Sequence, residues 1–223
     1  MSSISIHSEA AEKFVTPVES GDWTLEKFQL SEQERKSFVM RQMFRETPTK
    51  GYDYHIKSNK DYIRLCRGNE VWMSDTPMEM GTCMQFMKQA HGNVFVAGLG
   101  IGVTLLPVIE NPEVKKIVVA EIDQNVIDIW EKASANIDTS KVEIHNCNCH
   151  EPEKFLKKGE KFDTLWFDIW VSICSDNYPE TKELYSKYRK YINYKNPKRF
   201  VGFWMRDYIK REYLKENNDG FWF

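Results

Sequence analysis

The chain has 223 residues, of which 41% are hydrophobic and 29% are charged, as in ordinary soluble globular proteins. Its 31 lysines and arginines nearly balance 33 aspartates and glutamates, so the net charge indicates neither a nucleic-acid nor a membrane partner. The longest apolar runs are strand-sized and no secretory signal precedes them, which predicts a cytoplasmic protein without a membrane span. Five cysteines without a disulfide-type spacing fit reduced thiols.

The N-terminal part, residues 1–75, is expected to form a small α+β cap. Residues 1–20 are rich in serine and glutamate and predict a loose start. Residues 31–46, SEQERKSFVMRQMFRE, predict a helix that begins with a Ser-x-x-Glu capping box. Apolar residues on both sides of a Gly-Asn pair predict a β-hairpin over residues 62–73.

Residues 76–223 are expected to form a second, larger domain. Thr76-Pro77-Met78-Glu79 combines a capping box with proline at the first helical position, and predicts one helix that runs to Gly92. The runs VFVAG, KIVVAEID, KVEIHNC, FDTLWFDIW and RFVGFWM then read as strands, with helical segments between them. This alternation is typical of βαβ units, so we expect an α/β, Rossmann-like domain whose mostly parallel sheet is covered on both faces.

A glycine-rich turn follows the first of these strands. Gly98, Gly100 and Gly102 alternate directly behind VFVA, and glycine allows both a tight turn and the close approach of a ligand to the backbone. Glu121 ends the second strand, 23 residues after Gly98, where an acidic side chain suits hydrogen bonding to ribose hydroxyls. Because the carboxyl ends of parallel strands form the ligand crevice, we expect a nucleotide-type site there.

The segments VFVAGLGIG, IVVAEID and FDTLWFDIW resemble motif I, motif II and the fourth-strand motif of class I S-adenosylmethionine-dependent methyltransferases, and are most similar to the spermidine-synthase-like branch. The resemblance implies a strand order of 3-2-1-4-5. An antiparallel strand pair usually closes this sheet, and we expect that pair to be truncated here, because only GFWF follows the last expected helix. The implied cofactor is S-adenosyl-L-methionine or its decarboxylated form. In that fold the three glycines would lie against the methionine part and Glu121 would hold the ribose.

Two further residues take roles from the same resemblance. Asn148 stands where such enzymes usually have an aspartate that contacts adenine, and its side-chain oxygen can accept the same hydrogen bond. Asp168 occupies the position of the carboxylate that handles the attacking amine, and is the expected catalytic residue, although a cap or ion-pair role is the simpler alternative. The polyamine enzymes follow this aspartate with a Ser- and Asp-rich segment, whereas this chain has Ile169-Trp170.

The most favoured function is therefore methyl transfer from S-adenosylmethionine to an unidentified small-molecule acceptor. Aminopropyl transfer of the spermidine-synthase kind and a non-catalytic module that binds an adenosyl ligand remain alternatives. Four more residues are substrate candidates, namely Asp75, Glu79, Trp170 and Asp176. Asp176 is equally suited to cap the next helix. A homodimer is left open.

Three other patterns are interpreted as structural. His145, Cys147, Cys149 and His150 are crowded at one strand end, where alternate side chains point to opposite sides, so we expect no metal site. Asp123 is expected to cap a helix, and the methionines of residues 78–87 to fill the core. Residues 181–199 contain seven basic and one acidic residue with four interleaved tyrosines. This pattern suits a nucleic-acid surface, but we favour a helix that packs its tyrosines on the sheet.

Overall fold

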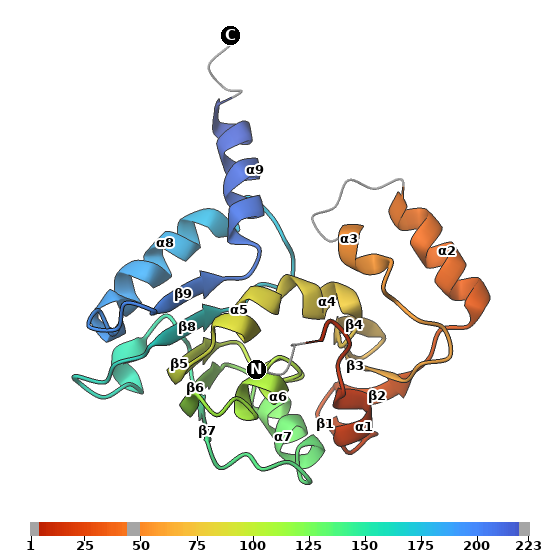
Figure 1. Cartoon of the computed structure of the whole chain (residues 1–223), viewed down its shortest axis with the longest axis horizontal. Helices are drawn as coiled ribbons and strands as arrows, with labels where there is room; N and C mark the ends of the chain where they lie inside the picture. Colours follow the sequence, from red (N-terminus) through yellow and green to blue (C-terminus); the bar gives the residue numbers. More distant parts are fainter. Residues whose placement is uncertain (1–4, 44–49, 219–223) are drawn as a thin grey trace.

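The computed structural model describes residues 5–43 and 50–218, which form two sheets with helices between and around them (Figure 1). The antiparallel sheet has the order β1-β2-β3-β4, with β1 (Val18–Ser20), β2 (Trp23–Phe28), β3 (Tyr62–Arg67) and β4 (Glu70–Ser74). The second sheet is parallel, with β5 (Gly92–Ala97), β6 (Val114–Glu121), β7 (Val142–Asn146), β8 (Thr164–Phe167) and β9 (Phe200–Phe203). Its order β7-β6-β5-β8-β9 confirms the predicted 3-2-1-4-5 arrangement.

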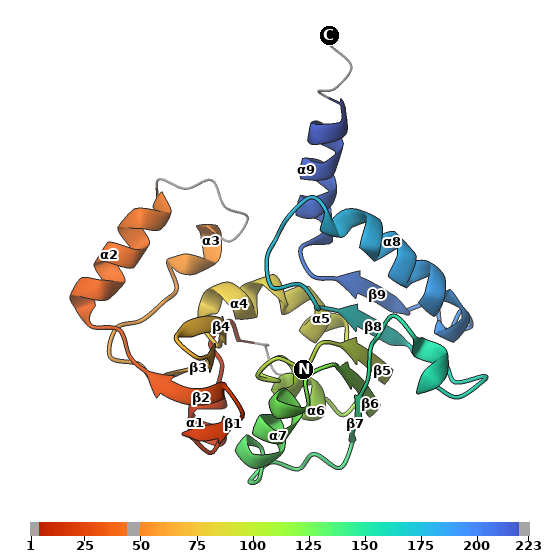
Figure 2. The same ribbon diagram turned by 180° about the vertical axis from the view of Figure 1, so that it is seen from behind.

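Nine α-helices and two short 3-10 turns connect these strands within the described residues. The helices are α1 (Ala10–Lys13), α2 (Glu32–Met43), α3 (Lys50–Asp53), α4 (Pro77–Thr82), α5 (Met84–Gln89), α6 (Leu105–Ile109), α7 (Gln124–Ala133), α8 (Asn177–Tyr188) and α9 (Arg206–Asn218). In both ribbon views α4 and α5 lie between the two sheets (Figures 1 and 2). Among residues 5–43 and 50–218, no helix is both long and apolar enough to cross a membrane.

The parallel sheet is buried on both faces, which explains its nearly continuous apolar strands. Along β5, Val94 and Val96 pack into one core with α5, α6 and α7, whereas Phe95 and Ala97 pack into a second core with α8. All four are at most 2% exposed. Successive side chains of a strand point to opposite faces, so a strand with both faces buried shows no polar alternation.

The N-terminal cap is more extensive than the sequence predicts. The hairpin of β3 and β4 and the Ser31–Glu34 capping box of α2 are confirmed. The expectation of a loose start over residues 1–20 is wrong for the described part, because α1 and β1 lie there and Phe14 is buried. The missed signal is a short apolar pattern, in which Ala10 and Phe14 contact the core. Residues 1–4 and 44–46 of these predictions lie outside the described residues.

The predicted helix from Pro77 towards Gly92 is broken into α4 and α5 at Cys83, where φ is −95° and ψ is 0°. The Thr82 hydroxyl donates to the carbonyl of Glu79 at 2.8 Å, a side-chain bond that competes with the regular helical ladder. The predicted capping box at Thr76 is also absent, because the Glu79 carboxylate accepts from the backbone N–H of Ser74 instead. The break turns Cys83 towards the end of β8.

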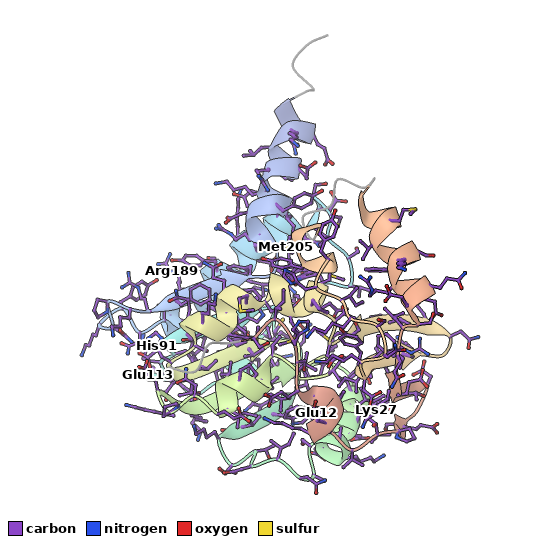
Figure 3. All side chains as sticks on the ribbon, turned by 45° about the vertical axis from the view of Figure 1, so that its right-hand side comes forward. Glu12, Lys27, His91, Glu113, Arg189 and Met205 are labelled. Carbon is purple, nitrogen blue, oxygen red and sulfur yellow. The ribbon has the colours of Figure 1, made fainter. Side chains whose placement is uncertain are left out.

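The C-terminal segments follow the predicted packing. Tyr188 and Tyr191 are buried beneath the sheet, whereas Tyr185 and Tyr194 are 44% and 54% exposed. Helix α9 projects from the body of the molecule, and Met205, at a φ of 52°, turns the chain into it from β9 (Figure 3). Helix α8 ends at Tyr188, and Tyr191 lies in the 3-10 turn that follows it. The favoured interpretation of residues 181–199, a helix with tyrosines on the sheet, is therefore confirmed for Tyr188 and is wrong for the two exposed tyrosines.

Candidate active site

A cavity of about 630 Å³ lies at the carboxyl ends of β5, β6 and β8. One wall comes from the antiparallel sheet, through side chains of β2, β3 and β4, and another comes from α4 and its junction with α5. The volume is within the range of small-ligand sites. Seven predicted site residues line it, namely Gly98, Gly100, Glu121, Asn148, Asp168, Glu79 and Trp170.

Three predicted site residues are not among those that line this cavity. Gly102 packs against Trp130, since an added Cβ would lie 2.3 Å from that indole. Asp75 is fully buried behind β3, where its carboxylate accepts from the backbone N–H of Ile63 at 2.8 Å. Asp176 is exposed at the start of α8, and its side chain makes no capping hydrogen bond.

The three glycines of the turn pack closely against other segments of the protein. All three glycines have positive φ, between 53° and 90°. A Cβ on Gly98 would lie 2.0 Å from the carbonyl oxygen of Asp168, so this glycine lets the ends of β5 and β8 approach. Above Gly100 lies Met73 of β4, whose sulfur also accepts from the backbone N–H of Ile101 at 3.4 Å.

Glu121 connects the end of β6 to the glycine turn. One carboxylate oxygen accepts from the backbone N–H of Leu99 at 2.8 Å, and the other accepts from that of Asp123 at 2.9 Å. Asp123 caps α7 as predicted, through a 2.9 Å bond from the backbone N–H of Asn125, and also accepts from the indole N–H of Trp23. These bonds fix the acidic edge of the cavity against the antiparallel sheet.

Asp168 follows β8 on the other side of the glycine turn. Burial raises its pKa to about 7, while the nearby Cys83 thiol and Trp166 indole lower the pKa in part. The Cys83 thiol donates to Asp168 Oδ2 at 3.6 Å, and burial together with that carboxylate raises the pKa of the thiol. A carboxyl group with a pKa near 7 is suited to proton transfer at neutral pH.

Glu79 is a second acid in the same cavity, and its side chain is half-buried. Burial raises its pKa to about 8; hydrogen bonds from Ser74 lower it in part, and the neighbouring carboxylates of Asp168 and Asp75 raise it further. Burial likewise raises the pKa of Asp75 to about 6. Of these three acids, Glu79 therefore holds its proton to the highest pH.

The outer edge of the cavity carries a small polar network. Glu180 of α8 accepts from the indole N–H of Trp170 and pairs with His150, with 2.9 Å between His150 Nε2 and Glu180 Oε1. Asn148 is exposed, and its side-chain oxygen accepts from the backbone N–H of His150 at 2.9 Å. In the described residues no group of three or more His, Cys, Asp or Glu side chains is arranged to hold a metal ion.

Sequence reasoning missed several cavity residues, above all tryptophans. Five of the seven tryptophans line the cavity, namely Trp23, Trp72, Trp166, Trp170 and Trp204, of which only Trp170 was predicted. The other four belong to segments far apart in the chain. No local motif joins them, and the high tryptophan count was the one available signal.

A five-stranded parallel sheet in the order 3-2-1-4-5, with a glycine turn after its first strand and an acidic residue at the end of its second, has the Rossmann-like class I methyltransferase fold. Residues 77–194 match the family model described as spermine/spermidine synthase domain, and this match covers 118 of the 223 residues. The chain therefore belongs to the spermine/spermidine synthase domain family, which confirms the resemblance seen in the sequence.

Several solved structures are similar at low sequence identity. The spermidine synthase from Thermotoga maritima is 16% identical, with 81% of this chain and 53% of that chain covered and a TM-score of 0.44. A spermidine synthase in complex with the transition state analogue AdoDATO is 16% identical, with 81% and 55% covered and a TM-score of 0.47. TrmK of M. capricolum with S-adenosyl-homocysteine is 16% identical, with 49% and 46% covered and a TM-score of 0.40.

This chain spans about half the length of these spermidine synthases. No curated protein sequence matches it.

Proposed function

We propose that this chain is a transferase that uses a sulfonium adenosyl donor, with S-adenosyl-L-methionine as the donor and a methyl group as the transferred unit. The observation that carries the proposal is the placement of Glu121, tied to the glycine turn, and Asp168, with its raised pKa, in one cavity. The first residue suits a ribose and the second an acceptor nucleophile, so donor and acceptor would meet between β5 and β8.

The residues present fit an adenosyl group. Both oxygens of Glu121 accept backbone N–H groups, but a carboxylate offers about four acceptor positions, which leaves room for ribose hydroxyls. Ile122, directly after β6, is 72% exposed and lines the cavity, so it offers an apolar surface to a purine ring. Gly98 and Gly100 would hold the methionyl part and Asn148 the adenine edge.

When bound, the donor supplies a sulfonium carbon: the acceptor forms a bond to it, and the old carbon–sulfur bond breaks with its electron pair left on sulfur. Asp168 would take the proton that the acceptor nitrogen or oxygen loses, and would release it to solvent. Its pKa near 7 leaves a useful fraction of the carboxylate ionised at neutral pH. The remaining contribution of the protein is to position both partners and exclude water.

Aminopropyl transfer from decarboxylated S-adenosylmethionine is the second candidate, and two observations support it. The family match is to the spermine/spermidine synthase domain. In addition, the uncharged thioether of Met73 already accepts from the N–H of Ile101 on the glycine turn. A donor without a carboxylate would leave this contact in place.

A titration of the purified protein with S-adenosylmethionine, its decarboxylated form and S-adenosylhomocysteine tests the proposal. Release of S-adenosylhomocysteine across a pool of acceptors supports methyl transfer, and release of methylthioadenosine supports aminopropyl transfer. Tight binding without either product would favour a non-catalytic adenosyl-binding module. If none of the three compounds binds, the proposed function is refuted.

A further inference from the structure

Three tryptophans line the cavity together with Asp168, on the side formed by the ends of β8 and β9. Trp166 belongs to β8, Trp170 follows it, and Trp204 follows β9. Each ring is held by a contact with a neighbouring side chain. Trp166 stacks on Phe86 with ring centroids 5.2 Å apart, and the Trp204 indole donates to the Thr82 hydroxyl at 3.0 Å.

Trp170 is held in the same way by Glu180, which pairs with His150. Rigid aromatic side chains give contact area at little cost in conformational entropy. Their ring faces bind flat ligands or a single cation. The rim beside Trp170 is apolar too, because Val171 lines the cavity and is 65% exposed. This part of the cavity therefore offers aromatic and aliphatic surface to a small molecule.

The same region has little negative charge to offer. Four acidic side chains line the cavity in the described residues, and two of them, Glu121 and Asp123, already accept backbone hydrogen bonds on the donor side. The two on the acceptor side are Asp168 and Glu79, and burial raises the pKa of each, to about 7 and about 8. A polycation would lose its hydration here without enough ionised carboxylates to replace it.

One buried donor makes only a weak contact. The indole N–H of Trp166 lies close enough to Asp168 to lower the pKa of that carboxyl group, but it makes no hydrogen bond of normal geometry, and Trp166 is only 3% exposed. A buried N–H without a full hydrogen bond is costly, so a ligand oxygen with a spare lone pair would be stabilised at this position.

We propose that the acceptor is a small aromatic molecule with at most one positive charge, whose nucleophilic nitrogen or oxygen is directed to Asp168 by Trp166, Trp170 and Trp204. The inference rests on the proposed function and deepens it. The proton lost by the acceptor passes to the Asp168 carboxylate, and the acceptor gains the carbon that leaves the donor sulfur. The aromatic body of the acceptor would replace water against the three rings.

The test compares two amine classes on the whole protein with the donor side filled by S-adenosylhomocysteine or methylthioadenosine. Tryptamine and 2-phenylethylamine are titrated against putrescine and spermidine, by calorimetry and by quenching of tryptophan fluorescence. We expect the better aromatic amine to bind at least about tenfold more tightly than the better polyamine, from burial of its ring and from ring contacts. Tighter binding of a polyamine, or no binding of either aromatic amine at millimolar concentration, overturns the inference.

Variants at Trp170 separate the ring from its hydrogen bond. Trp170→Ala should weaken binding of the aromatic amine about fivefold to tenfold. Trp170→Phe, which keeps a ring, should weaken this binding less than about threefold. Tyr185→Ala, an exposed aromatic on α8 outside the cavity wall, is the matched control and should leave binding unchanged. Equal losses in the Phe and Ala variants would overturn the role of the ring. The donor products are first titrated alone, so a failure of the proposed function appears there as absent donor binding.

Discussion

Replacing Asp168 by asparagine should make the protein more stable relative to wild type as the pH rises from 5 to 8. In the unfolded chain an aspartate ionises near its ordinary pKa of 3.8, whereas burial raises the pKa of Asp168 to about 7 in the folded protein. The folded state therefore holds its proton longer than the unfolded state does. The resulting free-energy cost is absent well below pH 4, grows as the pH rises, and is complete above pH 7.

The two pKa values give the size of the effect. A difference of about three pH units corresponds to about 4 kcal/mol for complete ionisation, at 1.36 kcal/mol for each unit. Part of this cost is already present at pH 5, because the unfolded chain is ionised there. About 2 to 3 kcal/mol should therefore accrue between pH 5 and pH 8 in the wild type and be missing in Asp168→Asn.

Denaturant unfolding of both proteins at pH 5 and pH 8 measures this difference. Asp138→Asn is the matched control, because Asp138 is exposed and hydrogen bonds from Ser140 lower its pKa. Asp138 is thus ionised in both states over this pH range, and its variant should differ from wild type by the same amount at both pH values. If the free energy of unfolding of Asp168→Asn differs from that of the wild type by the same amount at both pH values, the raised pKa of Asp168 is refuted.

The remaining predictions concern the donor site and its supports. Glu121→Ala should weaken binding of the adenosyl donor by about 2 to 3 kcal/mol in calorimetry, through loss of a charge-assisted hydrogen bond, and unchanged affinity would remove this residue from the ribose role. Gly102→Ala should lower the free energy of unfolding by about 1 to 3 kcal/mol, because the new methyl would meet Trp130 at a φ of 69°; a neutral result in denaturant would contradict that packing. Cys83→Ala should raise the pKa of Asp168 by loss of a donor, while Cys83→Ser should lower the pKa, as read from the pH dependence of stability or turnover; identical profiles would exclude the contact.

The parallel sheet could be predicted because its information is local. Each strand is a short apolar run between helical segments, and both faces are buried, so the runs read almost without interruption. The glycine turn and Glu121 also carry their own signal, since the turn requires positive φ and the acid ends the next strand. The family resemblance then relates Asp168 to the same edge of the sheet.

Features that depend on distant pairing could not be predicted in this way. Strand β2 pairs with β3, so Trp23 lies opposite Arg67, more than forty residues away in the sequence. The sequence around Trp23 contains no signal for this pairing. The break at Cys83 likewise depends on a side-chain bond from Thr82 that a helical pattern does not reveal. The cavity tryptophans come from separate strands and loops, and only the folded chain brings them together.

Asp168 and Glu79 make the cavity costly to fold, a property that the proposed proton transfer at Asp168 would explain. Each is an acid whose burial raises the pKa, and Asp168 raises the pKa of Glu79 further. Amide or apolar residues of similar size would avoid this cost. The raised pKa values of both carboxyl groups keep the negative charge in this part of the cavity small at neutral pH, and Asp168 is the carboxyl group beside Cys83 and Trp166. An acceptor that brings one proton to that carboxylate and an aromatic surface to the tryptophans satisfies both features at once.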